Sequence, residues 1–332
     1  MIEFPPRLSL AQTPTPLQKL ERVSAELGVN LWIKRDDLTG SVLSGNKVRK
    51  LEFSFAEAMR QGCDAVITCG GLQSNHCRAT ALLGAQLGLE VHLVLRGEPE
   101  GPADGNLLLD YLAGAHINAY PVRQFASELQ DLLLQKQREL KLKGVNAMII
   151  PTGASDGVGI WGYIAATEEL QVDFHRHRIV PSHVVCATGS GGTQAGLTLG
   201  AYLHGWDSQV LGIAVCDDED YFQNKVRADM RAWKRGYDRH EDVEACEIHV
   251  HDGYIGPGYA KADPEVFETI GWLARTEGIV LDPVYTGKAF YGLVQEIKTG
   301  ALAGARDVVF VHTGGVFGIF PQKHQFQTEE GR

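Results

Sequence analysis

Residues 183–193 read HVVCATGSGGT, and this stretch decides the fold that we predict. Its apolar run VVCA (184–187) is typical of a strand that is buried on both faces. The run passes directly into a glycine-rich turn, and the next segment, QAGLTLGAYLHG (194–205), has the pattern of a buried helix. A strand, a glycine-rich turn and a helix in this order indicate a parallel sheet with helices on its faces.

The same alternation continues along the chain in both directions. The predicted strands are 64–71, 91–97, 147–155, 209–218 and 306–315, and the predicted helices are 74–88, 106–115 and 159–170. Apolar runs of this length, separated by helices, predict the α/β class. The polar stretch VDFHRHR (172–178) has no clear period, and we interpret it as a junction between domains.

Composition narrows the class of protein. A chain of 332 residues, 44% of them hydrophobic and 22% charged, favours two soluble domains. The first ten residues, MIEFPPRLSL, do not resemble a signal peptide, and the sequence has no apolar run of the length that spans a membrane. A net charge of −10 argues against a nucleic-acid partner. The six cysteines form no CxxC pair, which favours a reducing compartment, and we expect a cytoplasmic protein.

Four predicted strands end in turns of glycine or small polar residues. These turns are 69–71, 151–155, 188–193 and 312–315. Glycine often does no more than end a strand. However, ligands of open α/β sheets bind outside the carboxyl ends of the strands, where such turns collect. Four of them together favour a shared ligand cleft.

The turn Gly189-Ser190-Gly191-Gly192-Thr193 has the chemistry of a phosphate site. Its glycines allow several backbone N–H groups to face one point, and the hydroxyls of Ser190 and Thr193 add donors at the start of a helix. The alternative is a dinucleotide fingerprint. We favour a single phosphate, because Gln194 occupies the third glycine position of that fingerprint.

Lys47 opens a predicted helix and precedes Leu51 by four residues, which puts it on the apolar side of that helix. Burial and a helix N-terminus both disfavour an ammonium ion there, so its amine would be a good nucleophile for an aldehyde. From spacing alone, a lysine that reaches solvent is the more economical interpretation. We expect its neighbours Arg49 and Lys50 to be ordinary solvated residues.

Three further groups remain open between a structural and a functional role. Residues 73–76 (Gln-Ser-Asn-His) begin a predicted helix and would either cap it or hold a substrate carboxylate. Tyr259 and Tyr285 lie in glycine- and proline-containing loops, where they would either pack or contact a ligand. The histidines at 175, 177, 249 and 251 lack companions at zinc spacing, and we predict no metal site.

Five segments together resemble a known family. They are Ser-Gly-Asn-Lys (44–47), Gly-Gly-Leu-Gln-Ser-Asn-His (70–76), Gly-Ser-Gly-Gly-Thr (189–193), Leu-Asp-Pro-Val-Tyr-Thr-Gly-Lys (281–288) and His-Thr-Gly-Gly (312–315). They occur in the same order in fold-type II pyridoxal-phosphate enzymes, and this chain resembles the branch that contains D-cysteine desulfhydrase and 1-aminocyclopropane-1-carboxylate deaminase. The resemblance implies two open, mostly parallel twisted sheets covered by helices, as in the tryptophan synthase β subunit. It implies a small domain at 50–165, inserted into a large cofactor-binding domain of 1–49 plus 166–332. It also implies a homodimer.

The resemblance also implies a role for each matching residue. Lys47 would bind pyridoxal 5'-phosphate covalently, Asn75 would contact its phenolic oxygen, and residues Gly189, Ser190, Gly191, Gly192 and Thr193 would hold its phosphate. Thr286 and Thr313 would lie beside its ring. The catalytic residues would be Lys47, Ser74, Tyr259 and Tyr285, and the substrate contacts would be Asn46, Gln73, Ser74, Asn75, His76, Tyr259, Tyr285 and Gly314.

Within that branch, three positions favour the desulfhydrase. The deaminase pattern has Glu after the tyrosine, Leu in the HTGG stretch and Gln after Gln-Ser-Asn, where this chain has Thr286, Thr313 and His76. A neutral hydroxyl at the ring nitrogen makes a weaker electron sink than a carboxylate would, which suffices when the leaving group is a thiolate. We therefore expect α,β-elimination from a small amino acid, D-cysteine. The alternatives are the deaminase, an L-cysteate sulfo-lyase, a nucleotide-dependent dehydrogenase and a non-catalytic amino-acid-binding protein.

Overall fold

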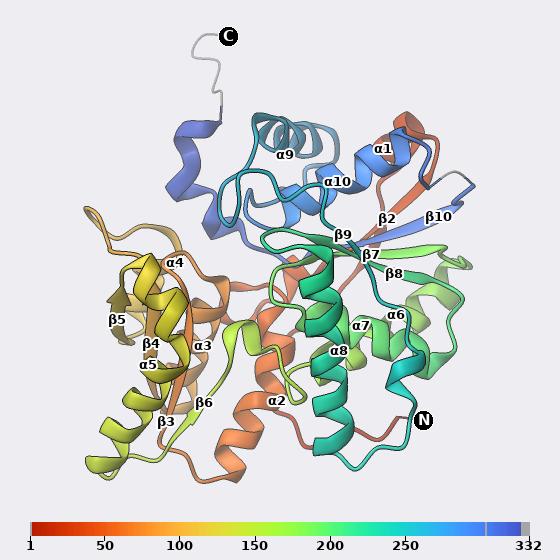
Figure 1. The fold of residues 1–332 in the computed structure, drawn as a ribbon. Helices are drawn as coiled ribbons and strands as arrows, with labels where there is room; N and C mark the ends of the chain where they lie inside the picture. The colour runs from red at the N-terminus through yellow and green to blue at the C-terminus, as the bar shows by residue number, and fades with distance from the viewer. Residues whose placement is uncertain (1, 303, 327–332) are drawn as a thin grey trace.

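The fold contains two β-sheets with helices packed on their faces, as Figure 1 shows for a computed structural model that describes residues 2–302 and 304–326. Within these residues the larger sheet has six strands: β1 (Leu17–Lys19), β2 (Asn30–Lys34), β7 (His183–Thr188), β8 (Gln209–Ala214), β9 (His249–His251) and β10 (Asp307–Val311). The described part of the smaller sheet has four: β3 (Ala65–Gly71), β4 (Glu90–Arg96), β5 (His116–Tyr120) and β6 (Ala147–Ile149).

The order of the strands confirms the predicted fold class. The larger sheet runs β1-β2-β10-β7-β8-β9, with all pairs parallel except β1 with β2. The smaller sheet runs β5-β4-β3-β6 and is parallel throughout. Parallel strands need crossover connections, and helices supply them.

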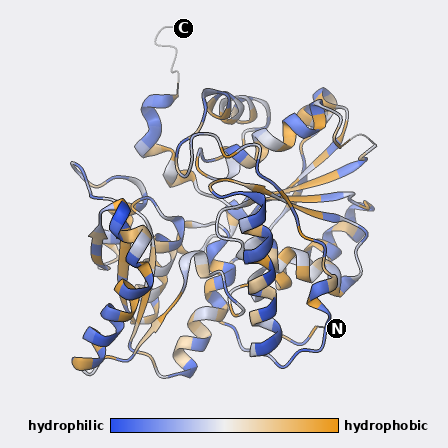
Figure 2. Cartoon of the chain, in the orientation of Figure 1, coloured by the Kyte–Doolittle hydropathy of each residue, from blue (hydrophilic) through white to orange (hydrophobic). Residues whose placement is uncertain are grey.

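The helices cover both sheets. Those of the described residues are α1 (Glu21–Leu27), α2 (Lys47–Arg60), α3 (Asn75–Leu87), α4 (Gly105–Leu112), α5 (Val122–Leu142), α6 (Trp161–His177), α7 (Gly192–His204), α8 (Glu219–Gly236), α9 (Pro264–Glu277) and α10 (Thr286–Lys298). Short 3-10 helices are η1 (Asp36–Leu38), η2 (Ser41–Leu43), η3 (Thr152–Ala154), η4 (Val243–Ala245), η5 (Val316–Gly318) and η6 (Phe320–Gln325). In Figure 2 the strands are largely hydrophobic and α8 is largely hydrophilic. The strands are buried between helices, whereas one face of α8 is exposed to solvent. None of these helices is both long and apolar enough to cross a membrane.

One close backbone approach brings the start of α2 against the turn that follows β10. Gly314 has a φ of +84°, and a Cβ at this position would lie 2.8 Å from the Cα of Gly45. The N–H of Asn46 donates to the carbonyl of Thr313 at 3.1 Å. Glycine at both contact positions allows the two segments to touch. Lys47, the first residue of α2, is therefore held beside the carboxyl end of the larger sheet.

The predicted junction at 172–178 is wrong, because α6 continues through these residues to His177. The carboxylate of Asp173 is buried and accepts from Lys34 Nζ at 2.7 Å, and Phe174 packs into the core. The polar residues 175–177 form the exposed last turn, and Arg178 then ends the helix in the left-handed conformation. The sheets separate the chain in the predicted sense, since the strands of the smaller sheet lie between Ala65 and Ile149. The domain boundaries at 50 and 165 stay a prediction.

The expectation that Arg49 and Lys50 are solvated is also wrong. Both side chains are buried, with Arg49 only 3% exposed. Arg49 donates to both carboxylate oxygens of Asp36 at 2.8 Å and to Glu169 of α6 at 2.7 Å. Burial lowers the pKa of Arg49, but the charges and hydrogen bonds of Asp36 and Glu169 together outweigh it, so the pKa is raised well above its ordinary value. A periodicity that marks the apolar side of a helix does not reveal such pairing.

We predict that Arg49→Leu will lower the free energy of unfolding by about 3–5 kcal/mol, because the substitution leaves two carboxylates without their buried partner. The measurement is the shift of the urea unfolding transition. The control is Arg60→Leu, which removes an exposed ion pair with Glu57 on the same helix and should change stability little. Equal losses in the two variants would contradict the role that we assign to Arg49.

Candidate active site

A cavity of about 510 Å³ lies where the carboxyl ends of the two sheets meet. Its walls are the turns after β3, β6, β7 and β10 together with the N-terminal residues of α2 and α3. The four small-residue turns therefore line one cleft, as the sequence predicts. The volume is in the range of small-molecule sites.

Most of the sequence-predicted site residues line this cavity. They are Asn46, Lys47, Ser74, Asn75, His76, Gly189, Ser190, Gly191, Thr193, Tyr259, Tyr285 and Thr313. Four others do not: Gln73, Gly192, Thr286 and Gly314.

Each of these four is engaged elsewhere. The amide of Gln73 accepts from the N–H of Asn106 at 2.8 Å, at the start of α4. The N–H of Gly192 donates to Ser155 Oγ, and Gly314 packs on Gly45. Thr286 is fully buried, and its hydroxyl donates to Asp282 Oδ1 at 2.7 Å. These four residues support the residues that line the cavity but do not themselves face it.

The amine of Lys47 lies in the cavity wall and is held by its neighbour. Its Nζ donates to Asn46 Oδ1 at 2.9 Å, and Asn46 Nδ2 in turn donates to Thr193 Oγ1 at 3.0 Å. Burial, reinforced by the positive charge of Arg78 and opposed by Asp282, lowers the pKa of Lys47 to about 8. With a pKa of about 8, roughly a tenth of this amine is unprotonated at pH 7, far more than for an ordinary lysine, and the neutral amine is a nucleophile and a base.

Asn75 is oriented by residues behind the cavity. Its Oδ1 accepts from Asn106 Nδ2 at 2.9 Å and from Arg78 Nη1 at 3.5 Å. With the oxygen occupied by two donors, the amide nitrogen is the group left to donate into the cavity. Its neighbour Ser74 caps α3 by accepting from the N–H of Cys77, so the structural role considered for Ser74 is confirmed while its side chain also lines the cavity.

His76 contributes a neutral ring to the wall. Its Nε2 lies 2.7 Å from the hydroxyl of Thr68, and the side chain is buried. Burial, with smaller contributions from Lys47 and Lys50, holds the pKa of His76 well below its ordinary value. This histidine does not add charge to the cavity.

Tyr259 and Tyr285 form a hydroxyl pair opposite Lys47. Their oxygens are 2.6 Å apart, and Lys47 Nζ lies 5.9 Å from the centroid of the Tyr285 ring. Burial and the neighbouring Tyr259 raise the pKa of Tyr285 well above its ordinary value. Tyr285 therefore remains protonated and can donate a hydrogen bond to a ligand.

The turn after β7 has the chemistry of an anion site. Gly191 precedes α7 with a φ of +85° and gives the helix no side-chain cap, which leaves N–H groups available at a positive helix end. Ser190 Oγ lies 2.8 Å from Ser155 Oγ. Lys50 Nζ donates to Ser155 Oγ at 3.3 Å, and Lys225 Nζ donates to the Ser155 carbonyl at 3.0 Å. Hydroxyls, free N–H groups and two lysines fit a phosphate dianion.

Sequence reasoning missed several cavity residues. They are Arg96, Phe125, Gln194, Cys216, Asp217, Tyr221 and Lys225. Arg96 had an available signal, because it is the last residue but one of the strand predicted at 91–97. Its guanidinium lies 4.5 Å from the centroid of the Tyr259 ring and forms no ion pair with any residue that the structure describes. Lys225, on α8, had no such signal.

Comparisons with known proteins agree with this geometry. The model of a family described as pyridoxal-phosphate dependent enzymes matches residues 8–314. The chain is 40% identical, over 97% of its length and 81% of the relative's, to a bifunctional D-cysteine desulfhydrase/1-aminocyclopropane-1-carboxylate deaminase of Arabidopsis thaliana. It is 36% identical, over 95% of each chain, to a D-cysteine desulfhydrase of Yersinia pestis. A solved structure of an ACC deaminase homologue superposes with a TM-score of 0.88 at 37% identity, over 96% of this chain and 95% of the other.

We predict that the cofactor-free protein will react with pyridoxal phosphate at a rate that rises with pH and levels off above about pH 8. Below the pKa of about 8, Lys47 is an ammonium ion and cannot attack an aldehyde. The measurement is the rate of appearance of visible absorbance across a pH series. Lys47→Ala should lack this component, and a wild-type midpoint near the ordinary lysine pKa of about 10.4 would contradict the lowered value.

A second prediction concerns Gly191. Gly191→Ala should weaken pyridoxal phosphate binding about tenfold or more. An alanine here would have to adopt a φ of +85°, and its Cβ would lie 3.1 Å from Lys225 Cγ. Gly205→Ala is the matched control, with a φ of +64° and nothing within 4 Å of the added Cβ. Binding is measured by titration of the cofactor-free protein. Unchanged affinity in Gly191→Ala, or equal losses in both variants, would show that the turn does not hold the phosphate.

Proposed function

This chain belongs to the pyridoxal-phosphate dependent enzymes, and from that premise we propose that it catalyses the α,β-elimination of D-cysteine, with Lys47 as the lysine that binds the cofactor. The cofactor is pyridoxal 5'-phosphate. When bound, it would supply an electrophilic aldehyde for the amine of the substrate and an aromatic ring that can accept electrons from Cα. The products would be pyruvate, hydrogen sulfide and ammonia.

In this proposal Lys47 moves the proton at Cα. Its lowered pKa leaves the amine free to accept that proton near neutral pH. Loss of the proton leaves an electron pair at Cα, which forms a double bond to Cβ as the sulfur departs with the electrons of the Cβ–S bond. Water then hydrolyses the released enamine to pyruvate and ammonia, so the reaction needs no oxidant or reductant.

Residues at the start of α3 would position the substrate. Ser74 and the N–H groups of this helix end suit a carboxylate, and the amide nitrogen of Asn75 suits the phenolic oxygen of the cofactor. Tyr285, which stays protonated and is paired with Tyr259 at 2.6 Å, would donate a hydrogen bond to the leaving sulfur. The side chain of Phe125 adds an apolar surface that helps to exclude water.

One observation carries the choice of reaction: a hydroxyl, Thr313, lines the cavity after β10, and the nearby carboxylate of Asp282 is fully engaged. Asp282 accepts from the N–H groups of Val284, Tyr285 and Thr286 and from the hydroxyl of Thr286. It has no lone pair free to hold a proton on a ring nitrogen. The cofactor ring would be a weak electron sink, which suits a thiolate leaving group more than a carbon leaving group.

A second candidate is the elimination of sulfite from L-cysteate. Arg96 favours it, because its guanidinium lines the cavity without an ion-pair partner among the described residues. A sulfonate would satisfy that charge. Cleavage of 1-aminocyclopropane-1-carboxylate, which the names of the Arabidopsis relative and of the similar solved structure suggest, remains the third candidate, and a non-catalytic amino-acid-binding protein is the fourth.

The test is a side-by-side assay of D-cysteine, L-cysteine, L-cysteate and 1-aminocyclopropane-1-carboxylate. We expect sulfide and pyruvate in equal amounts from D-cysteine, and little or no 2-oxobutyrate from the cyclopropane acid. Lys47→Ala should lower turnover at least about 10³-fold and should remove the visible absorbance of the bound cofactor. Wild-type turnover in this variant would contradict the role of Lys47.

Arg96→Gln separates the two elimination reactions. It should lower kcat/KM for L-cysteate much more than for D-cysteine if the guanidinium binds a sulfonate, and should affect both equally if it only packs on Tyr259. A wild-type preference for the cyclopropane acid would overturn the electronic argument from Thr313 and Asp282. Absence of any turnover, with cofactor bound, would favour a binding protein.

We also propose that the enzyme acts as a homodimer in the cytoplasm. Support for a self-association surface comes from exposed apolar side chains on α4, with Leu112 72% exposed. The six cysteines are all free thiols, which suits a reducing compartment. Light scattering of the purified protein tests the first proposal, and fractionation of the native cells tests the second.

A further inference from the structure

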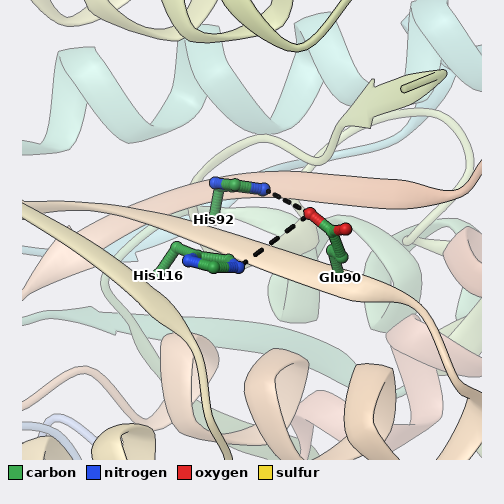
Figure 3. Close-up of side chains that lie close together, drawn as sticks. All are labelled: Glu90, His92 and His116. Atoms are coloured by element: carbon green, nitrogen blue, oxygen red, sulfur yellow. Dashed lines mark hydrogen bonds and ion pairs between the residues drawn. The ribbon is translucent and has the colours of Figure 1, made fainter. Parts of the chain in front are cut away.

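Two histidines and a glutamate come together on the smaller sheet, away from the cavity (Figure 3). Glu90 and His92 point to the same side of β4, because they are two residues apart on one strand. His116 begins β5 and lies in register with His92. Sequence reasoning missed this group, since only the pairing of β4 with β5 brings His116 to the other two.

We propose that Glu90, His92 and His116 form a binding site for a divalent transition-metal ion of the Zn²⁺ class. The ligand atoms of the three residues lie within 4.8 Å of one another. Imidazole nitrogen and carboxylate oxygen are ligands that Zn²⁺ prefers, and two histidines with one glutamate are a known three-residue set for this ion.

The distances support a single ion between the three side chains. In a tetrahedral site with bonds of roughly 2.0–2.1 Å, two ligand atoms are about 3.3–3.4 Å apart. Glu90 Oε2 lies 3.3 Å from His92 Nε2 and 3.9 Å from His116 Nε2. A single ion would require the Glu90 and His116 side chains, which are both more than half exposed, to rotate toward it.

The two imidazole rings face the same carboxylate, but they are stacked, and an imidazole binds a metal ion in its own ring plane, so His116 would have to turn out of the stack to share an ion with His92. They stack with centroids 4.5 Å apart and planes inclined by 13°, and both direct Nε2 toward the Glu90 carboxylate (Figure 3). His92 is buried, while the side chains of Glu90 and His116 are 52% and 59% exposed. An ion would thus be anchored on one buried ligand and would have an open position for water.

The surrounding charges do not oppose a cation strongly. Lys136 of α5 is the nearby cation that acts on His92, and it is paired with Glu139 at 2.8 Å. Glu90 brings a negative charge that no cationic side chain of the described residues pairs with, apart from the two histidines.

The site would stabilise the sheet rather than take part in the reaction. It joins β4 to β5, which is an edge strand, and it lies at the beginning of β4. Arg96, which lines the cavity, is at the other end of β4, roughly 20 Å away at about 3.3 Å per residue. An ion here would hold the exposed edge strand in place, and turnover should not require it.

The test uses the cofactor-loaded protein after treatment with a chelator. Titration with ZnCl₂ alone should show one high-affinity site per chain, and Zn²⁺ should raise the melting temperature. Co²⁺ should give visible d–d bands of nitrogen and oxygen ligation without a thiolate charge-transfer band, which separates this site from the free cysteines. Turnover of the wild type should be the same with and without bound Zn²⁺ once excess metal has been removed.

Glu90→Gln and His116→Ala should each weaken Zn²⁺ binding about 100-fold or more, since even residues that only support a metal ligand cost 10–100-fold. Both side chains are more than half exposed, so neither variant should unfold. His249→Ala is the matched control. Glu247 and His249 have the same spacing and a 3.2 Å contact, but no third ligand atom joins them in the described part of the chain.

Loss of the site in Glu90→Gln and His116→Ala, with normal binding in His249→Ala, would support the proposal. Wild-type affinity in either of the first two variants would overturn it, as would equal weakening in the control. A Co²⁺ spectrum dominated by thiolate charge transfer, or no stoichiometric binding of Zn²⁺ at micromolar concentration, would also overturn it.

Discussion

The placement of Lys47, to which we propose the cofactor binds, depends on a buried ion pair behind it. Arg49, two residues after Lys47 on α2, is joined to Asp36 in η1 and to Glu169 on α6. Lys34 of β2 extends the same network to Asp173. Helix α2 is thereby held on two sides, and the amine of its first residue, Lys47, lines the cavity and donates to Asn46. Breaking a buried pair costs several kcal/mol, so the orientation of α2 is strongly constrained.

The cavity has to meet two electrostatic requirements, for a neutral amine and for a phosphate, and different lysines are involved in each. A nucleophilic amine has to lose its proton easily, and burial together with the charge of Arg78 does this for Lys47. The phosphate that we propose to bind here would need positive charge, which the N-terminus of α7 and Lys225 would supply. Burial, and next the charge of Lys47, lower the pKa of Lys50 well below its ordinary value. A phosphate dianion would oppose that shift, so cofactor binding and protonation of Lys50 should favour each other.

Features that depend on one strand and the turn after it could be predicted from the sequence. Parallel strands place their carboxyl ends at one edge, so the turns at 69–71, 151–155, 188–193 and 312–315 could be predicted to share a cleft. Features that depend on contacts between distant elements could not be predicted. The burial of Arg49 requires Glu169, 120 residues away, and the group at Glu90, His92 and His116 requires the pairing of β4 with β5. Thr286 was assigned to the cofactor ring by its place in a motif, whereas its hydroxyl is bound to Asp282.

The contact between Thr286 and Asp282 is relevant to the choice between elimination and cyclopropane cleavage that we propose for this site. Asp282 is buried against the first N–H groups of α10, and burial raises its pKa even though four donors oppose the shift. A glutamate at position 286 would bring a second carboxylate toward an already buried one, and two like charges in such a site cannot both ionise without a large free-energy cost. A glutamate at position 286 would therefore also alter how Asp282 is bound. If the cofactor ring lies beside Thr313 as we propose, the residues at 282 and 286 would have to change together for a carboxylate to reach it.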